Sequence, residues 1–227
     1  MSAVTPCARR CAVPIALAIA VAALCYSAWV LEFVLPIDTD PVDGFLSELD
    51  AEGKPYRAVF ATADKLTGLL LLPAAVAGLL VFPRRGLTTL GWSALFCFGA
   101  ATIADTLFPL RKCATDCAEG GLFPQLHQPH ALTSTLAVTS IAVAAFAFSA
   151  AAYRYRRWRI LRELGLGVLA IGTAATIWML VADNLPGSHA LGIAQRIQVG
   201  AMSLWLLALA AAVLIESREH AAADCPG

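Results

Sequence analysis

Six long apolar runs divide this chain, and each is long enough to cross a bilayer as a helix. They lie near residues 12–36, 60–82, 87–108, 131–152, 164–182 and 191–215. A helix needs about 20 apolar residues to cross roughly 30 Å of hydrocarbon, and a backbone inside lipid must satisfy its own hydrogen bonds. The runs therefore predict an all-α, polytopic integral membrane bundle of six transmembrane helices.

The composition supports a membrane protein and excludes a nucleic-acid binder. Hydrophobic residues make up 59% of the chain and charged residues only 14%, with a formal net charge of zero. A soluble domain carries about 25% charged residues, and a chain without net charge has no overall field to attract nucleic acid. We therefore expect membrane lipids as partners, and no nucleic acid.

The first run follows Arg9 and Arg10, as the apolar part of a signal peptide would. It is longer, however, than the roughly 7–15 apolar residues of such a segment, and no small-residue cleavage site stands out after it. We expect it to be kept as a membrane anchor. The chain then divides into an N-terminal segment (1–11), a six-helix transmembrane domain (12–215) and a C-terminal tail (216–227).

The positive charges predict the orientation, because short cytoplasmic loops of membrane proteins accumulate Lys and Arg. If the N-terminus is cytoplasmic, ten of the 16 Lys and Arg residues lie on the cytoplasmic side, many in the short loops FPRRG (82–86) and YRYRRWRILRE (153–163). We therefore expect both termini in the cytoplasm.

Two cysteines lie in the loop between the third and fourth runs, on the side expected to face the oxidising compartment. Cys113 and Cys117 are four residues apart, and two nearby thiols in such a compartment are more often a disulfide than a metal pair. Together with His127 and His130 they read C-x3-C-x9-H-x2-H, which has metal-ligand types but not the spacing of structural zinc sites. A disulfide is favoured, and metal ligation and free thiols stay open.

Ionisable and hydroxyl side chains recur where the helices approach the outer side. They are Asp64, Asp105, His130, Ser134, Asp183, His189 and Arg196. Charges at membrane depth are costly, so they usually face the bundle interior and pair there. His130 and Ser134 are one turn apart and share a face of their helix. We therefore expect an outward-facing polar pocket.

The fifth and sixth runs are expected to add an acid and a base to this pocket. Small residues at Gly165, Gly172 and Thr176 share a helical stripe with Asp183, and such stripes pack against other helices. Arg196 needs an anion, either one of the aspartates or a lipid phosphate, unless its side chain extends to the interface. The predicted pocket thus contains Asp64, Asp105, His130, Asp183 and Arg196.

Four short motifs carry a resemblance to a known family. They are PYRAVFATADKLTGLLLL (55–72), IADTLFPLRKCATDC (103–117), HALTSTLA (130–137) and GIAQRIQVG (192–200). The chain resembles the bacterial membrane family catalogued as domain of unknown function 998 across all six runs. This resemblance implies a six-helix fold in the inner membrane of a bacterium, and it draws attention to Asp64, Asp105, His130 and Arg196 without assigning them roles.

A more distant similarity is to the membrane hydrolases that include alkaline ceramidases, which hold zinc among three histidines, an aspartate and a serine. Under this alternative His127, His130 and His189 are the metal ligands, and Asp105, His130 and Ser134 are the catalytic set. Zinc there would activate a water molecule. The chain departs from that superfamily in having six runs, not seven, and in lacking paired histidines on its last helix.

Two functions therefore follow from the sequence. The first is a protein without a cofactor whose polar pocket binds a lipid headgroup or a membrane protein partner. The alternative is a zinc-dependent hydrolase acting on a lipid. A metal-free hydrolase would need His130 to activate Ser134 from one turn away on the same helix, a poor position for a base. Transport is disfavoured, because the acids gather at one side and not at the midplane.

Overall fold

The structure is a computed structural model that describes residues 6–110, 129–187 and 189–223, with side chains from residue 12 to residue 217 of these ranges. Within them every regular element is helical, and six helices are long and apolar enough to cross a membrane. The predicted all-α membrane bundle is confirmed. Cys113, Cys117 and His127 lie outside the described residues, so the disulfide stays a prediction.

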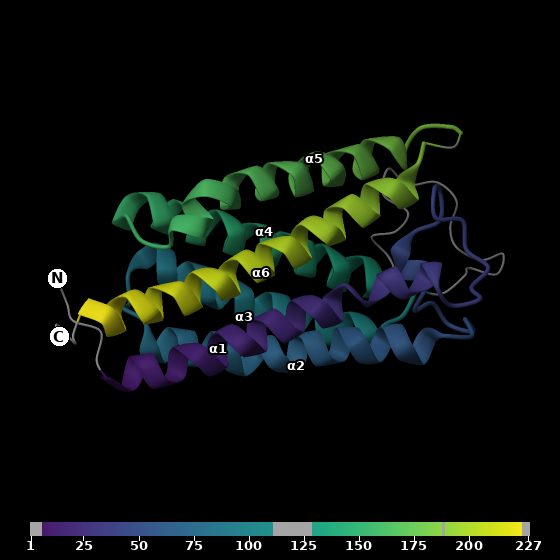
Figure 1. The fold of residues 1–227 in the computed structure, drawn as a ribbon. Helices are drawn as coiled ribbons and strands as arrows, with labels where there is room; N and C mark the ends of the chain where they lie inside the picture. Colours follow the sequence, from purple (N-terminus) through teal and green to yellow (C-terminus); the bar gives the residue numbers. More distant parts are fainter. Residues whose placement is uncertain (1–5, 111–128, 188, 224–227) are drawn as a thin grey trace.

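The helices run alternately up and down (Figure 1). In chain order they are α1 (Pro6–Tyr26), the 3₁₀ helices η1 (Ala28–Phe33) and η2 (Leu46–Glu48), α2 (Arg57–Val81), α3 (Gly86–Leu107), α4 (Pro129–Tyr155), the π-helical turn η4 (Leu161–Gly165), α5 (Leu166–Ala182) and α6 (Leu191–Ala223). The start of α1 and the end of α6 lie at one end of the bundle, here called the termini end. The other end, which holds residues 34–56, is called the loop end.

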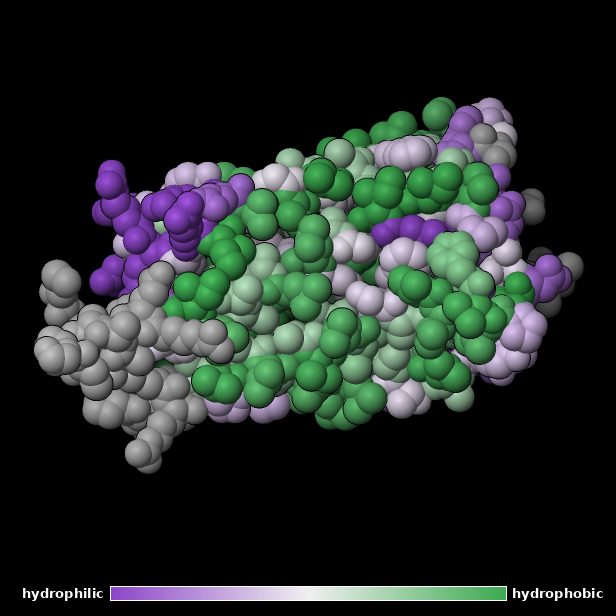
Figure 2. Space-filling view, in the orientation of Figure 1, coloured by the Kyte–Doolittle hydropathy of each residue, from purple (hydrophilic) through white to green (hydrophobic). Residues whose placement is uncertain are grey.

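The surface matches a protein embedded in lipid. In Figure 2 hydrophobic side chains cover the middle of the visible face, and hydrophilic side chains gather mainly toward the two ends. Large apolar side chains such as Leu24, Leu80 and Leu180 are more than half exposed along the spans. Contact with acyl chains explains this exposure, since lipid is as apolar as a protein core.

Each helix has a distinct place in the bundle. α1 packs between α2 and α6, α3 packs between α2 and α4, and α5 packs mainly on α6. Only 11% of the span containing α5 is buried, against 61% of the span containing α6. α5 is therefore the peripheral helix, with α6 as its main support, and its contact with α4 is slight.

Glycines permit the closest helix approach, where α2 crosses α3. A Cβ atom added to Gly68 would clash with the carbonyl oxygen of Gly99, and one added to Gly99 would lie 3.2 Å from the carbonyl oxygen of Gly68. Small residues allow membrane helices to pack backbone against backbone in this way. The crossing fixes the position of α2 relative to α3 one turn from Asp64.

The first span is not one continuous α-helix as expected. The α-helix ends at Tyr26, and the chain continues as the narrower helix η1. The hydroxyl of Ser27 donates to the carbonyl oxygen of Ala23 at 2.9 Å, which competes with the helical pattern at this point. The change of helix type brings Glu32 into the bundle, where it is buried.

Residues 34–56, here called the cap segment, fold back over the loop end and attach to the start of α6. The amide of Ile193 donates to the carbonyl oxygen of Val42 at 3.1 Å, and the amide of Ala190 donates to Asp43 Oδ1 at 2.8 Å. Leu46 and Leu49 of the cap segment are buried in a small apolar cluster of their own. The cap segment is thus a packed layer of the fold.

Candidate functional site

A cavity of about 120 Å³ lies beneath the cap segment, between the loop-end parts of the helices. A single buried water needs only about 10–15 Å³ measured in this way, so the space accepts a small chemical group. We call it the polar cavity. Its lining residues are Tyr26, Ala28, Trp29, Leu46, Ser47, Leu49, Asp50, Phe60, Asp64, Asp105, Ser134, Ala137, Val138, Gln195, Gln198, Val199 and Met202.

Asp105 of α3 is the centre of a hydrogen-bonded cluster with α4. Its Oδ1 lies 3.1 Å from His130 Nδ1 and accepts a hydrogen bond from the hydroxyl of Thr133. The hydroxyl of Ser134 donates to the same carboxylate at 3.0 Å. His130, Thr133 and Ser134 fall within the first turns of α4, so one carboxylate fastens this helix start to α3.

The cluster does not have the order of a nucleophilic serine site. Ser134 Oγ lies 3.4 Å from His130 Nε2 but closer to Asp105, at 3.0 and 3.1 Å from its two oxygens. In a Ser-His-Asp triad the histidine stands between serine and aspartate and takes the hydroxyl proton. Here Asp105 binds both partners directly, so the geometry favours a structural network at the wall of the polar cavity.

Three carboxylates from three parts of the chain face the polar cavity: Asp50 from the cap segment, Asp64 from α2 and Asp105 from α3. The pKa of Asp50 is raised to about 6, first by burial and then by the nearby charge of Asp105, while His130 and Arg57 act in the opposite direction. The hydrogen bonds among described side chains do not include the carboxylate of Asp64. These acids therefore surround an open space without full pairing inside the described protein.

Aromatic rings complete the walls of the polar cavity. Tyr26, Trp29 and Phe60 belong to its lining, and the hydroxyl of Tyr26 lies 3.8 Å from Met202 Sδ. The indole Nε1 of Trp29 is buried without a hydrogen-bond partner among the described residues. A buried N–H of this kind is costly unless water or a ligand accepts its hydrogen bond.

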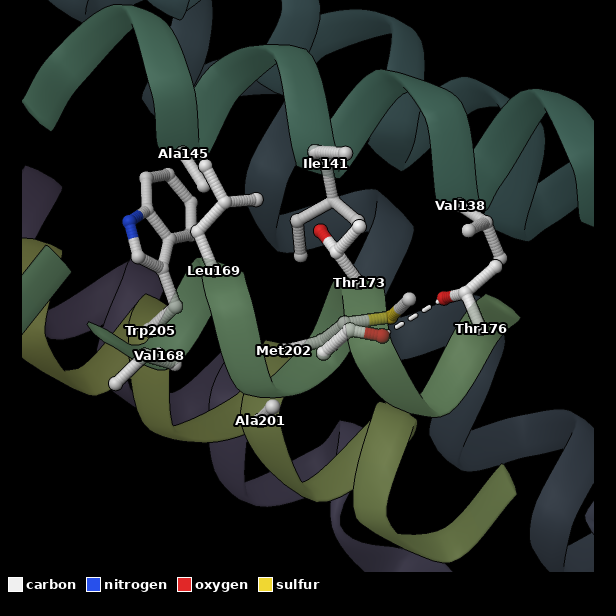
Figure 3. A pocket seen from close by; sticks show the side chains of 12 residues that line it. Val138, Ile141, Ala145, Val168, Leu169, Thr173, Thr176, Ala201, Met202 and Trp205 are labelled. Atoms are coloured by element: carbon white, nitrogen blue, oxygen red, sulfur yellow. Dashed lines mark hydrogen bonds between the residues drawn. The ribbon is translucent and has the colours of Figure 1, made fainter. Parts of the chain in front are cut away.

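A second, apolar hollow of about 40 Å³ lies between α4, α5 and α6 (Figure 3). We call it the apolar groove. Its lining residues are Val138, Ile141, Ala142, Ala145, Val168, Leu169, Gly172, Thr173, Thr176, Ala201, Met202 and Trp205. Val138 and Met202 also line the polar cavity, so the two hollows share a wall made by these two side chains.

Arg196 lies apart from the polar cavity in a buried ion pair. Its Nε donates to Glu32 Oε1 at 2.7 Å, and Nη2 donates to the other carboxylate oxygen. Nη1 donates to the carbonyl oxygens of Gly44 at 3.0 Å and Gly192 at 2.9 Å. The side chains of Arg196 and Glu32 are only 9% and 1% exposed. The guanidinium therefore joins η1, the cap segment and α6.

The structure brings together some of the predicted pocket residues and separates others. Asp64, Asp105 and Ser134 line the polar cavity, and His130 is held against Asp105. Asp183 is exposed at the end of α5, and the buried residues of α5 are Val168, Ala175 and Ala182. The expected convergence must therefore be corrected for Asp183, because α5 is peripheral and Asp183, just beyond its last residue, is exposed.

Arg196 requires a second correction, because its partner is Glu32 and not one of the three aspartates. The expectation overlooked Glu32, an acid inside the first apolar run. Asp50 also lines the polar cavity, and it was not among the predicted pocket residues. A signal for Glu32 was present in the sequence, since an acid in a membrane span needs a partner. No sequence signal distinguished Asp50 from the other acids of residues 34–56.

The predicted metal ligands are only partly described. His127 lies outside the described residues, and His189 Nε2 lies 3.2 Å from the carbonyl oxygen of Pro186 in the α5–α6 connection. Among the described residues, no three His, Cys, Asp or Glu side chains are grouped as they would be to hold a metal ion. His130 is committed to Asp105.

Comparison with known proteins gives one match. The family model described as "Protein of unknown function (DUF998)" matches residues 19–212, a range that begins inside α1 and ends inside α6. No curated protein and no solved structure matches the chain. Because the match includes most of the chain and all six spans, this multi-pass protein belongs to the DUF998 family.

Proposed function

We propose that this protein binds a membrane lipid and receives its headgroup in the polar cavity. The observation that carries the proposal is the cavity itself, about 120 Å³ in volume and faced by three carboxylates and a serine hydroxyl. Binding sites in proteins are typically concave, with a few polar groups that converge on the ligand.

The depth of the cavity supports a lipid headgroup as the ligand. It lies at the loop end, where the apolar spans finish and the cap segment begins. Headgroups occupy this depth in a bilayer, while the hydrocarbon core is only about 30 Å thick. A lipid could therefore place its headgroup in the cavity without leaving its leaflet.

The charges support a cavity that faces away from the cytoplasm. The Arg-rich segments that contain Arg84, Arg85 and Arg154 connect helices at the termini end, and such segments favour the cytoplasmic side. The measurement is labelling of single cysteines in whole cells with a membrane-impermeant thiol reagent. Asp38→Cys in the cap segment should react, and Arg84→Cys should react only after lysis. The reverse pattern would contradict the orientation.

Lipid binding is tested by extracting lipids from the purified full-length protein and quantifying them by mass spectrometry. Ala137→Leu adds volume to a buried residue of the cavity wall. We expect this variant to retain clearly less lipid than the wild type. Leu136→Phe is the matched control, because Leu136 is 50% exposed on the same helix and the added volume meets only the surroundings. Equal lipid content in all three proteins would count against the proposal.

The alternative of a zinc-dependent lipid hydrolase rests on the more distant resemblance and on the proximity of Asp105, His130 and Ser134. Metal analysis of the purified protein, with and without His130→Ala, separates it from simple binding. Stoichiometric zinc in the wild type that is lost in the variant would support hydrolysis. A protein partner is tested in the same preparation, because it would copurify in fixed proportion.

A further inference from the structure

We infer that the lipid has an ammonium group in its headgroup, which lies among Asp50, Asp64 and Asp105, and that the start of one acyl chain lies in the apolar groove. This inference rests on the proposed function and names the class of lipid that the site accepts. It follows from the charge of the polar cavity, its aromatic walls and its shared wall with the apolar groove.

The charge balance of the polar cavity favours a cation. Three carboxylates face it, and the cations that act on Asp50 are His130 and Arg57. Arg196 is already paired with Glu32. When all three acids are ionised and His130 is protonated, the acids outnumber these cations by one, and an ammonium group bound among them favours this ionised state. An anionic headgroup would add repulsion at short range, whereas an ammonium group would supply the missing positive charge.

The aromatic lining favours a substituted ammonium over a simple metal ion. Tyr26, Trp29 and Phe60 all line the same hollow as the three acids. Ring faces attract organic cations, and aromatic side chains combined with acids are a common way to recognise ammonium groups. The buried indole N–H of Trp29 has no partner among the described residues, and it can donate to an oxygen of the same headgroup.

The apolar groove provides a place for an acyl chain of the same lipid. It shares Val138 and Met202 with the polar cavity, and Figure 3 shows Val138 reaching the groove from α4 and Met202 from α6. Methionine has a flexible side chain that adapts to a ligand. Since α4 and α5 touch only slightly, a chain can approach from the bilayer between them. The groove holds only part of an acyl chain, and the remainder stays in lipid.

The headgroup is tested with full-length protein in mild detergent, titrated with phosphatidylcholine, phosphatidylethanolamine or phosphatidylglycerol of identical acyl chains. We expect at least one of the two ammonium lipids to bind about tenfold or more tighter than phosphatidylglycerol, since removal of a charge contact typically costs such a factor. Asp64→Asn should weaken the binding of that lipid. Asp38→Asn is the matched control, because Asp38 is an exposed acid of the cap segment outside the cavity lining.

The position of the acyl chain is tested separately. Thr173→Trp adds bulk to an exposed residue of the groove wall. It should weaken the binding of long-chain lipids more than the binding of short-chain lipids with the same headgroup. Ile177→Trp changes an exposed residue of α5 outside the groove lining. It should leave the affinities for long-chain and short-chain lipids unchanged. If Thr173→Trp weakens the binding of short-chain and long-chain lipids equally, the acyl chain does not lie in the apolar groove.

The outcomes distinguish this inference from the proposed function. Equal or tighter binding of phosphatidylglycerol would overturn the ammonium class but leave lipid binding intact. No binding of any of the three lipids would contradict both. If Asp64→Asn does not fold, Asp50→Asn in the cap segment provides the same test, because Asp50 faces the cavity from a different element.

Discussion

Two charged regions lie side by side at the loop end, and they differ in how their charges are balanced. In the first, two hydrogen bonds to Glu32 and two to backbone carbonyl oxygens engage all three nitrogens of the Arg196 guanidinium. In the second, Asp50, Asp64 and Asp105 face an open volume and are only partly paired. The charges of the first region are balanced within the protein, and we propose that a ligand balances those of the second.

This difference separates a structural role from a binding role. A charge that the protein pairs fully holds elements together, and its loss is felt as instability. A charge that faces a cavity and is not fully paired can interact with a ligand, so its removal should mainly lower the binding affinity. The following predictions test this distinction, from the largest expected effect to the smallest.

Glu32→Gln is expected to have the largest effect on stability. It leaves the buried cation of Arg196 without its carboxylate, which costs on the order of 3–5 kcal/mol for a fully buried pair. Thermal unfolding in detergent measures this loss. The double variant Glu32→Gln, Arg196→Gln should recover part of it, because it removes the orphaned charge.

The matched control is Glu163→Gln, the same chemical change in the pair of Arg159 and Glu163. Their side chains are 79% and 52% exposed, and surface pairs contribute only about 1 kcal/mol or less. If Glu32→Gln lowers stability no more than Glu163→Gln does, the Arg196 pair does not hold η1, the cap segment and α6 together.

Gly192→Ala should have an intermediate effect, because it affects the contact between α6 and the cap segment. An added Cβ would clash with the carbonyl oxygen of Gly44 and lie 2.8 Å from that of Pro41. Overpacking of this kind costs about 1–3 kcal/mol. We expect a lower unfolding temperature and weaker lipid binding, because the cap segment covers the polar cavity.

Gly200→Ala on the same helix is the control for helix propensity. Its nearest neighbour to an added Cβ is Trp29 at 3.9 Å, an ordinary contact. It should therefore be neutral or slightly stabilising. If both variants lose stability equally, the close approach at Gly192 has no special importance.

Asp50→Asn should have the smallest effect and the clearest dependence on pH. The pKa of Asp50 is raised to about 6 from 3.8, so the folded chain binds this proton more tightly than the unfolded chain. Its contribution to stability therefore falls as pH rises from about 4 to above 6. Asparagine cannot ionise, so the variant should unfold at a higher temperature than wild type at pH 7.5 and at about the same temperature at pH 4.

The same titration predicts weaker binding of an ammonium lipid in acid. Below pH 6 Asp50 becomes neutral, and the cavity loses a negative charge that interacts with Asp105, His130 and Arg57. Wild-type affinity should fall between pH 7.5 and pH 5, and Asp50→Asn should remove part of that dependence. A stability difference that grows toward low pH would contradict the assigned direction.

The fold could be predicted from the sequence because lipid allows few alternatives. Six apolar runs of sufficient length predict six helices, and each predicted run corresponds to one candidate span. The predictions that were wrong concern features that depend on contacts between parts of the fold. The first α-helix ends at Tyr26, next to the hydrogen bond of the Ser27 hydroxyl to Ala23, and the exposure of Asp183 goes with the peripheral position of α5.

The site could be predicted only in part, because pairing across helices is a tertiary property. Asp64, Asp105, His130 and Ser134 were identifiable as costly polar groups near helix ends, and the structure brings them together. The partner of Arg196 depended on the rotation of η1, which no pattern in the sequence defines. The role of Asp50 depended on the path of the cap segment over the bundle.

The glycine crossing of α2 and α3 has a consequence for how the acids respond to charge. Asp64 is four residues before Gly68, and Asp105 is six residues after Gly99, so both carboxylates extend from a contact where one backbone meets the other. The helices cannot slide apart there to relieve repulsion between the two acids. We therefore expect a cation to bind between these two acids without a large change in helix arrangement.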